Sequence, residues 1–328
     1  MVSALIEVED LKKYFPVERG FFFRGKKKFV HAVDGVDFTI KKGETLALVG
    51  ESGCGKTTTA RLVLRLLEAT SGIVRFMGRN IFELEEEELR LLRRQMQIIF
   101  QDPYASLNPR KTISQILSKP YLIHAKKMAR GEAKQKALSL LEKVALVPAE
   151  SFIERWPHEL SGGQKQRIGI ARALALNPKF IVADEPVSSL DLTVRVQILN
   201  LMKDLQRDLN LTLLYITHDL GTVRSIAHRV AVMYLGKIVE TALVKNLYEN
   251  PAHPYTEGML SATPIPNPRK TRERKSVILK GDVPSPMNPP SGCRFHTRCP
   301  YARPECSISE PSFTEIEPEH LVRCKFPL

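Results

Sequence analysis

Short apolar runs and helical repeats alternate along most of the chain. The run Thr45–Val49 (TLALV) is apolar on both faces, as a buried parallel strand is, and Ala4–Glu9 and Val36–Ile40 are further candidate strands. The pattern of Lys56–Glu68 predicts a helix that is apolar on nearly all sides, and residues 102–158 predict a more polar helical region. Strands and helices then alternate again, which is typical of a parallel sheet covered by helices.

The pattern changes after Asn250, where nine prolines fall within a short stretch. We therefore divide the chain into a large α/β domain at 1–250, a proline-rich linker at 251–290 and a cysteine-bearing tail at 291–328. Proline fixes the backbone and removes a hydrogen-bond donor, so the linker is expected to be irregular, with neither helix nor sheet.

Composition fits a soluble, folded protein: 43% of residues are hydrophobic and 26% are charged. No apolar run is long enough to cross a bilayer, and the first residues lack a secretory signal, so we expect a cytoplasmic location. The net charge is +13, with basic clusters at 24–28 and 269–275. These clusters are expected to be solvated loops or contacts with lipid headgroups or a membrane partner, not a nucleic-acid platform.

A phosphate-binding loop follows the strand that ends at Val49. The segment GESGCGKT (Gly50–Thr57) fits G-x-x-x-x-G-K-[ST] and precedes a predicted helix. Glycines let backbone N–H groups turn toward phosphate oxygens, and the helix N-terminus favours an anion. We expect Lys56 to reach the β- and γ-phosphates of ATP and the Thr57 hydroxyl to ligate Mg²⁺. The expected nucleotide-binding residues are Ser52, Gly53, Cys54, Gly55, Lys56, Thr57 and Thr58.

A second site is predicted where the apolar run FIVADE (Phe180–Glu185) ends in two acids. A buried strand would deliver Asp184 at its carboxyl end, where it would hold Mg²⁺ directly or through water. Successive side chains of a strand alternate in direction, so Glu185 would point elsewhere. Glu185 is our candidate to orient or deprotonate the attacking water.

A third segment, LSGGQKQR (Leu160–Arg167), predicts a second helix start prepared for an anion. Ser161 is a candidate N-cap, and the two glycines after it leave the backbone bare. The helix that follows carries an apolar stripe that includes Ile168, Ala171 and Leu174.

Together, LSGGQ, the phosphate loop and FIVADE resemble the motifs of ABC-family ATPases. The resemblance implies an α/β fold: a P-loop ABC ATPase domain with a RecA-like core, an antiparallel β subdomain and a helical subdomain, followed here by an irregular cysteine-rich extension. Gln101, after QIIF, matches the glutamine that senses Mg²⁺ and the attacking water. His218, in YITHD, matches the histidine that contacts the γ-phosphate. Tyr14, in LKKYF, matches the aromatic residue that stacks on adenine, with Phe15 as the nearest competitor.

In that family two ATPase subunits pack head to tail, and each ATP lies between the phosphate loop of one and the LSGGQ of the other. The resemblance therefore implies that a second set of residues binds the nucleotide of the opposite subunit. This set comprises Ser161, Gly162, Gly163, Gln164 and Asp191, the last within SSLD. The resemblance also implies a catalytic set of Glu185, His218 and Gln101, and a Mg²⁺ set of Thr57, Gln101 and Asp184.

The tail narrows the resemblance. The segments at 253–264 and 281–302 are similar to the C-terminal extension of peptide-importer ATPases, which serve dipeptide, oligopeptide and some nickel importers. This implies two transmembrane permease subunits, a second ATPase subunit (sister or identical), an extracytoplasmic binding protein, and a place at the cytoplasmic face of the membrane.

The tail also holds Cys293, Cys299, Cys306 and Cys324. Disulfides would be unusual in the cytoplasm, so we expect four thiolates that converge on a metal, either one zinc ion or a [4Fe–4S] cluster. The spacing lacks the C-x2-C pairs of common zinc and ferredoxin motifs. The resemblance to peptide-importer ATPases implies the [4Fe–4S] cluster. His296, His320 and the nearby arginines are expected to be solvated or to support the ligands.

Other classes of ABC-type ATPase act on nucleic acid or on ribosomes. DNA-repair members separate their motifs by a long coiled coil or zinc insertions, and ribosome-binding members carry two ATPase units. This chain carries one unit, and Gly50 and Leu160 lie too close together for such an insertion. We therefore expect no nucleic-acid partner.

Overall fold

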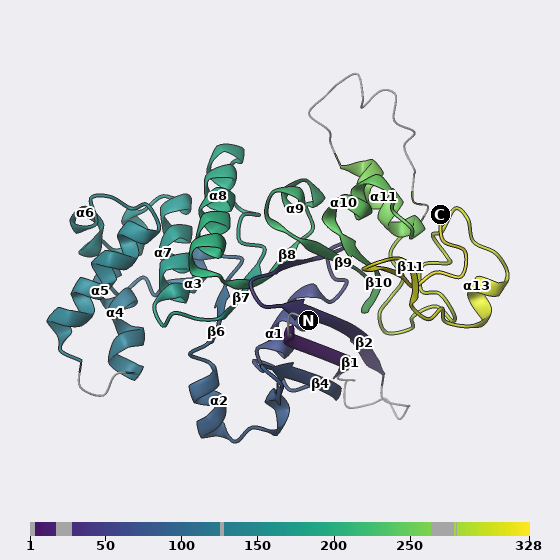
Figure 1. The fold of residues 1–328 in the computed structure, drawn as a ribbon, viewed down its shortest axis with the longest axis horizontal. Coiled ribbons are helices and arrows are strands. Elements are labelled where there is room, and N and C mark those ends of the chain that lie inside the picture. The colour runs from purple at the N-terminus through teal and green to yellow at the C-terminus, as the bar shows by residue number, and fades with distance from the viewer. Residues whose placement is uncertain (1–3, 18–27, 125–127, 264–278, 280) are drawn as a thin grey trace, which may run out of the picture. The chain divides into compact units, whose positions relative to one another are not determined.

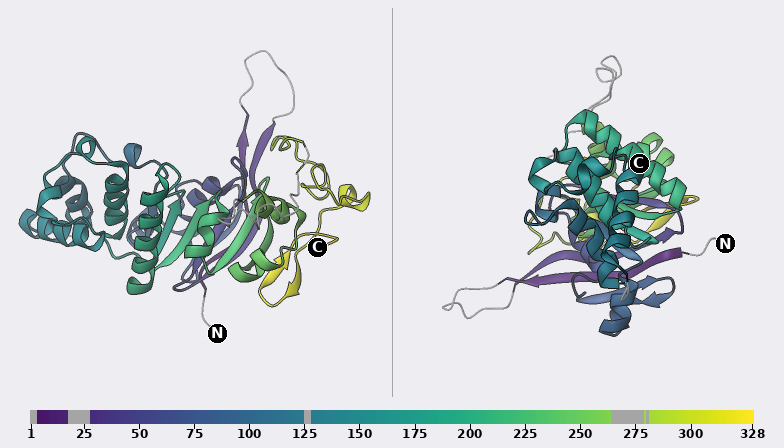
Figure 2. Two further views of the ribbon diagram at one scale, coloured as in Figure 1. Left: turned by 90° about the horizontal axis from the view of Figure 1, so that it is seen from above. Right: turned by 90° about the vertical axis from the view of Figure 1, so that its left-hand side faces the viewer.

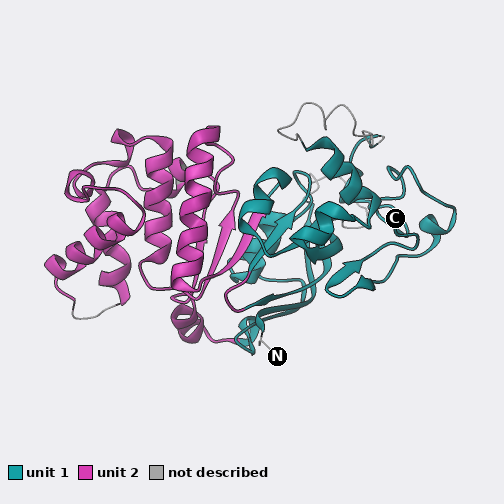
Figure 3. Ribbon diagram, turned by 45° about the horizontal axis from the view of Figure 1, so that its top comes forward, with its two compact units in different colours: residues 1–41, 45–83, 217–328 teal, residues 42–44, 84–216 magenta. Residues whose placement is uncertain are grey.

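A computed structural model describes residues 4–17, 28–124, 128–263, 279 and 281–328 (Figure 1). The chain forms two compact units (Figure 3). Unit 1 comprises residues 1–41, 45–83 and 217–328, and unit 2 comprises residues 42–44 and 84–216. Almost all of the two predicted basic clusters lies outside the described residues.

Unit 1 contains an antiparallel sheet with the strand order β2-β1-β4-β5. It also contains five strands of a second sheet, in the order β11-β12-β10-β9-β3. Among these five, only the β3–β9 pair is parallel. The antiparallel sheet is made of β1 (Ala4–Pro16), β2 (Phe29–Lys41), β4 (Ser71–Phe76) and β5 (Arg79–Asn80). The other strands are β3 (Thr45–Val49), β9 (Arg229–Tyr234), β10 (Lys237–Leu243), β11 (Thr314–Glu317) and β12 (His320–Val322). The helices are α1 (Lys56–Val63), η1 (Ile81–Glu83), α9 (Leu220–Ile226), α10 (Val244–Glu249), α11 (Pro254–Ala262) and α13 (Glu305–Ile308).

Unit 2 combines the parallel strands β8-β7-β6 with the predicted helical region. Its strands are β6 (Met96–Ile99), β7 (Phe180–Asp184) and β8 (Thr212–Thr217). Its helices are α2 (Glu86–Leu92), α3 (Pro103–Ser106), α4 (Ile113–His124), α5 (Arg130–Lys143), α6 (Glu150–Ile153), η2 (Pro157–Glu159), α7 (Gly162–Leu174) and α8 (Leu192–Leu209). Every residue of β7 is buried, which agrees with the apolar pattern that predicted a buried strand.

Strands β1 and β2 run longer than the predicted strands Ala4–Glu9 and Val36–Ile40, and two further elements differ from the prediction. Helix α1 ends at Val63 instead of Glu68, because Arg65 adopts a left-handed conformation with φ of 46° and the N–H groups of Leu66 and Leu67 turn back to the carbonyl of Arg61. The proline-rich segment was expected to be irregular, but it contains the helix α11.

Helix α11 forms because its proline stands where a helix tolerates one. Pro254 occupies the first turn, where its missing N–H would have no partner within the helix in any case. His253 caps the same end, and its Nδ1 accepts a hydrogen bond of 3.1 Å from the N–H of Tyr255. The position of a proline within a segment therefore decides whether it ends a helix or starts one.

The end of the chain extends the sheet of unit 1. Strand β12 pairs with β10, placing Val322 opposite Glu240. Strand β11 pairs with β12, and the two form the yellow hairpin in the left view of Figure 2. The Glu240 carboxylate is fully buried and accepts hydrogen bonds from the N–H groups of Ala252 and His253, at 2.8 and 2.9 Å. Its third partner is the buried ring of His320, at 2.7 Å. The tail is therefore bound to the ATPase fold through a buried polar cluster.

We expect Glu240→Leu to lower the free energy of unfolding by about 3–5 kcal/mol, the usual effect of leaving the partners of a buried charge without it. Urea unfolding of the purified chain measures the effect. Glu249→Leu is the matched control, because Glu249 is exposed on α10 and its replacement should change stability little. Adding His320→Leu to Glu240→Leu should recover part of the loss. Equal stability of the wild type and Glu240→Leu would show that this cluster does not hold the tail.

No helix among the described residues is long and apolar enough to cross a membrane.

Candidate functional site

The phosphate loop lies in unit 1 between β3 and α1, as the sequence predicts. Gly50 and Gly55 are required by close backbone neighbours: a Cβ would lie 2.1 Å from the carbonyl oxygen of Met233 at Gly50 and 2.2 Å from that of Ala32 at Gly55. Gly55, with φ of 112°, is the residue directly before α1. Gly53 also has a positive φ of 79°, and a Cβ there would meet nothing within 4 Å. The loop thus keeps an open face at Gly53 while its base is packed against backbone.

Lys56 is buried, and its amine is held inside the loop. Nζ donates hydrogen bonds of 2.8 and 2.9 Å to the carbonyl oxygens of Gly50 and Glu51. Cys54 is also buried, and burial raises the pKa of its thiol. A neutral, enclosed thiol fits a packing role better than a redox role. The loop therefore places one ammonium group among its own backbone carbonyl oxygens, and this cation is suited to phosphate oxygens.

The carboxyl end of β7 lies in unit 2 and carries both predicted acids. Asp184 is the last residue of the strand and is only 5% exposed. Glu185 follows in a left-handed conformation with φ of 45°, and its N–H donates to the carbonyl oxygen of Ile216 at 3.0 Å. The side chain of Gln101 donates a hydrogen bond of 3.0 Å to Glu185 Oε2. The structure thus brings together two of the three predicted catalytic residues.

The LSGGQ segment begins α7 as predicted. The Ser161 hydroxyl accepts a hydrogen bond from the N–H of Gln164 at 3.3 Å, and the Gln164 side chain accepts one from the N–H of Ser161 at 3.0 Å, which completes a capping box. A Cβ at Gly163 would lie 2.5 Å from a methyl group of Val194, so the helix start packs closely on α8. Asp191 caps α8 by accepting from the N–H of Val194 at 3.0 Å.

The remaining predicted residues of the nucleotide site lie in unit 1. His218 is exposed in the turn between β8 and α9. The ring of Tyr14 lies 4.3 Å from that of His31, and its hydroxyl donates a hydrogen bond to Asp34. Burial and the Asp34 carboxylate raise the pKa of Tyr14, so this hydroxyl stays protonated. No sequence motif includes Asp34, so its contact with Tyr14 was not predicted.

Two arginines of the tail contact the nucleotide-binding part of unit 1, and the sequence analysis missed both contacts. Arg298 binds the carboxylate of Glu51 and Arg294 binds that of Asp34. Both arginines are only 9% exposed, and His320 is fully buried. Of the two expected roles, solvation is therefore wrong for these three side chains, while support of metal ligands stays a prediction. Partners so distant in sequence leave no local pattern to detect.

The four cysteines of the tail line one cavity, which they share with His253, Phe295 and His296 among others. Burial raises the pKa of the Cys293 thiol to about 11. Among the described residues, however, no three His, Cys, Asp or Glu side chains are grouped as a bound metal ion requires. The predicted metal centre is therefore not present as a formed site in the structure.

The phosphate loop, the acidic end of β7 and the LSGGQ helix start define a P-loop ATPase of the ATP-binding cassette class. Comparison with known families agrees: residues 33–188 match the ABC transporter family, and residues 239–306 match the family described as oligopeptide/dipeptide transporter, C-terminal region.

Curated relatives match nearly the whole chain. The oligopeptide transport ATP-binding protein AppF of Bacillus subtilis is 52% identical over 98% of this chain and 97% of its own length. The oligopeptide transport ATP-binding protein OppF of Salmonella typhimurium is 47% identical, and the dipeptide transport ATP-binding protein DppF of Haemophilus influenzae is 48% identical, each over 98% of this chain and 96% of its own length.

Among solved structures, a dimeric bacterial ABC transporter cassette matches with a TM-score of 0.64 and 29% identity, over 73% of this chain and 98% of that one. A dimeric cassette in a post-hydrolysis state, bound to ADP and Pi, matches over the same shares with a TM-score of 0.63 and 29% identity. The chain therefore belongs to the ABC transporter family and is an ATPase.

Proposed function

We propose that this ATPase powers the import of dipeptides and oligopeptides through a membrane transporter. The observation that carries the proposal is the match of residues 239–306 to the C-terminal region of oligopeptide/dipeptide transporters, within a chain similar over its whole length to peptide-transport ATP-binding proteins. The alternative, an ATPase that acts on nucleic acid or ribosomes, has no support among these relatives.

In the proposed mechanism, the phosphate loop and the β7 acids have separate tasks. Lys56 and the backbone N–H groups of residues 52–58 hold the phosphates of ATP, while Tyr14 stacks on the base. Thr57, Asp184 and Gln101 would hold Mg²⁺, which neutralises the charge on the phosphate oxygens.

Glu185 would accept the proton of the attacking water, and Gln101, which hydrogen-bonds to it, would orient that water. His218 would contact the γ-phosphate.

The functional unit would be a pair of ATPase subunits, either two copies or this chain with a sister chain. Ser161, Gly162, Gly163, Gln164 and Asp191 would complete the site of the opposite subunit, because the bare start of α7 is suited to the γ-phosphate anion. ATP would stabilise the closed pair, and the helical region at 102–158 would pass this closure to two membrane permeases. The ATPase domain at 1–250 would then lie at the cytoplasmic face of the membrane, with the linker at 251–290 and the tail at 291–328 attached to it.

A complementation experiment tests this function. In cells that lack the chain, uptake of a labelled dipeptide or tripeptide should be lost and should return with the wild type but not with Glu185→Gln. Affinity purification from detergent-solubilised membranes should recover permease subunits. Normal peptide uptake without the chain, with nucleic acid or ribosomes recovered in the purification, would overturn the proposal.

We further propose that Cys293, Cys299, Cys306 and Cys324 hold a [4Fe–4S] cluster, with a single zinc ion as the alternative. The support is the donor set: four thiols line one cavity, and this is the ligand type that iron–sulfur clusters and structural zinc sites use. A bound metal would hold together a tail whose described residues bury few apolar side chains apart from Phe295 and Val322.

Metal analysis of protein purified without oxygen distinguishes these cases. We expect about four iron and four acid-labile sulfide per chain, the composition of one cluster. Cys306→Ser should lose most of both. Cys54→Ser is the control and should keep both, because Cys54 lies in the phosphate loop. About one zinc without sulfide would establish the zinc alternative, and neither metal in wild-type protein would refute a resident metal.

A further inference from the structure

The segment between Cys293 and Cys299 reaches from the tail into the nucleotide-binding part of unit 1. Its backbone is compact: the N–H of His296 donates to Cys293 and that of Arg298 donates to Phe295. Phe295 is 1% exposed, and its ring lies 5.2 Å from that of Tyr234 and 5.4 Å from that of Tyr255. The segment is therefore fixed on the protein by a buried aromatic anchor, and an arginine stands on each side of it.

Arg298 forms a two-point contact with the phosphate loop. Nη1 donates to Glu51 Oε2 at 2.8 Å and Nη2 donates to Glu51 Oε1 at 3.1 Å. This parallel geometry is the strongest form of an arginine–carboxylate pair. Since Arg298 is only 9% exposed, solvent screens the pair less than it screens a surface pair.

The backbone of Glu51 also makes two hydrogen bonds within and around the phosphate loop. Its N–H donates to the hydroxyl of Tyr255 at 2.9 Å, and its carbonyl oxygen accepts from the amine of Lys56 at 2.9 Å. Fixing the Glu51 side chain therefore fixes the backbone that holds the phosphate-binding lysine. The guanidinium also neutralises a carboxylate that would otherwise repel a triphosphate anion.

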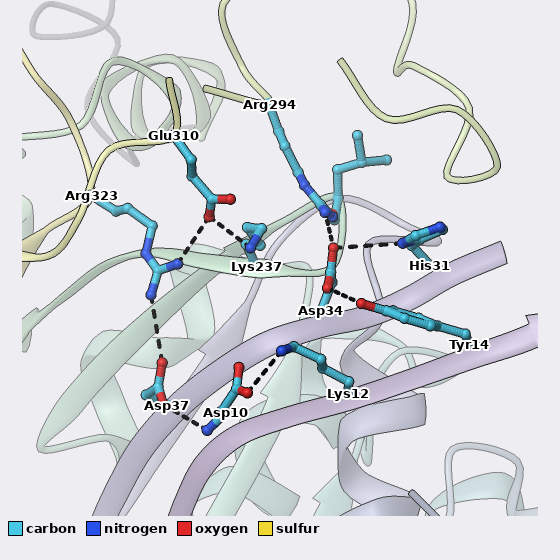
Figure 4. A network of polar contacts seen from close by, with 11 residues as sticks. Asp10, Lys12, Tyr14, His31, Asp34, Asp37, Lys237, Arg294, Glu310 and Arg323 are labelled. Atoms are coloured by element: carbon cyan, nitrogen blue, oxygen red, sulfur yellow. Dashed lines mark hydrogen bonds and ion pairs between the residues drawn. The ribbon is translucent and has the colours of Figure 1, made fainter. Parts of the chain in front are cut away.

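Arg294 is linked to Tyr14 through the carboxylate of Asp34 (Figure 4). Its guanidinium binds the Asp34 carboxylate and the carbonyl oxygen of Leu235. Asp34 in turn accepts the hydroxyl hydrogen of Tyr14, while the His31 ring lies beside that of Tyr14. Burial alone would raise the pKa of Asp34, but the Tyr14 hydrogen bond and the Arg294 charge outweigh it and keep that pKa below its usual value. The carboxylate is therefore a charged link between the tail and the aromatic ring.

We propose that the tail positions both ends of the ATP site: Arg298 positions the phosphate loop through Glu51, and Arg294 positions the base-stacking Tyr14 through Asp34. This inference rests on the proposed roles of the phosphate loop and Tyr14. It gives the tail a second role: the tail positions the nucleotide-binding residues in addition to holding any metal.

The two arginines can be compared in one experiment, because replacing each of them should change the affinities for two ligands differently. ATP has both a base and a triphosphate, whereas inorganic triphosphate has no base. Arg298→Gln should weaken the binding of both probes about tenfold, while Arg294→Gln should weaken ATP by a similar factor and leave triphosphate unchanged. Competition against a fluorescent ATP analogue on the full-length chain gives both affinities. Iron and zinc content is measured for each variant to check that the tail is retained.

Charge rescue separates positioning from a merely structural role. If Arg298 acts by neutralising and fixing Glu51, then Glu51→Gln should restore most of the triphosphate affinity lost in Arg298→Gln. Arg303→Gln is the control, because Arg303 is an exposed arginine of the same tail whose guanidinium lies over the Phe326 ring. It should leave both affinities unchanged.

Equal loss on both probes in Arg294→Gln and Arg298→Gln, without rescue by Glu51→Gln, would overturn the inference, as would unchanged affinities in both variants. If the wild-type chain itself bound neither probe, the proposed function would fail as well. Wild-type binding that Lys56→Ala abolishes, together with unaltered Arg294 and Arg298 variants, would sink this inference alone.

Discussion

Replacing Glu185 with glutamine is expected to leave ATP binding intact and to slow steady-state ATP hydrolysis by at least about a hundredfold, the usual range for loss of a general base. The amide keeps the size of the side chain and can still hydrogen-bond to Gln101, so the local structure should persist. It cannot accept a proton from water at neutral pH. The mutant should therefore accumulate the ATP-bound state.

Two measurements on Glu185→Gln make this prediction specific. Phosphate release gives the turnover rate, and equilibrium binding of ATP gives the affinity. Glu142→Gln is the matched control in the same unit, because Glu142 is exposed on α5, and its turnover should equal that of the wild type. Hydrolysis at the wild-type rate by Glu185→Gln would refute its assignment as the base.

Removing the amine of Lys56 should abolish tight ATP binding, with an expected loss of affinity of about a hundredfold or more, equivalent to at least about 2.7 kcal/mol. Lys56 is the buried lysine of the phosphate loop, and its Nζ donates hydrogen bonds to the carbonyl oxygens of Gly50 and Glu51. These are neutral partners, which a triphosphate can replace with a stronger, charged interaction. Both Lys56→Ala and Lys56→Met delete the charge, and Lys56→Met also keeps much of the packing volume.

Isothermal titration with ATP measures this effect, and circular dichroism verifies that each variant is folded. Lys245→Ala removes an exposed lysine of α10 and should bind ATP as the wild type does. An unchanged ATP affinity in folded Lys56→Met would sink the role assigned to Lys56.

The sequence predicted the local motifs well, because each motif is a short element with its own geometry. The strand β3, the glycine loop and the start of α1 are adjacent in the chain, so their order alone indicates the phosphate loop. The capping box at Ser161 likewise needs only residues three apart, and the structure contains it. The structure also adds the direct hydrogen bond between Gln101, which follows β6, and Glu185, which follows β7.

The tail was predicted least well. Its composition suggested a separate cysteine-bearing tail, but β12 pairs with β10, and His320 is buried against Glu240. The arginines near the cysteines were expected in solvent or behind the metal ligands, yet they bind Asp34 and Glu51. A composition rich in proline and basic residues carries no information on which distant carboxylates such arginines will meet.

The sequence by itself determined the class of protein, because the phosphate loop, the acidic strand end and the LSGGQ helix start each need only neighbouring residues to form. Only the tertiary structure decided how the tail joins the ATPase fold. The contacts of Arg294, Arg298 and His320 close loops of 80 to 260 residues, and such pairs form only when sheet pairing and burial have brought their segments together.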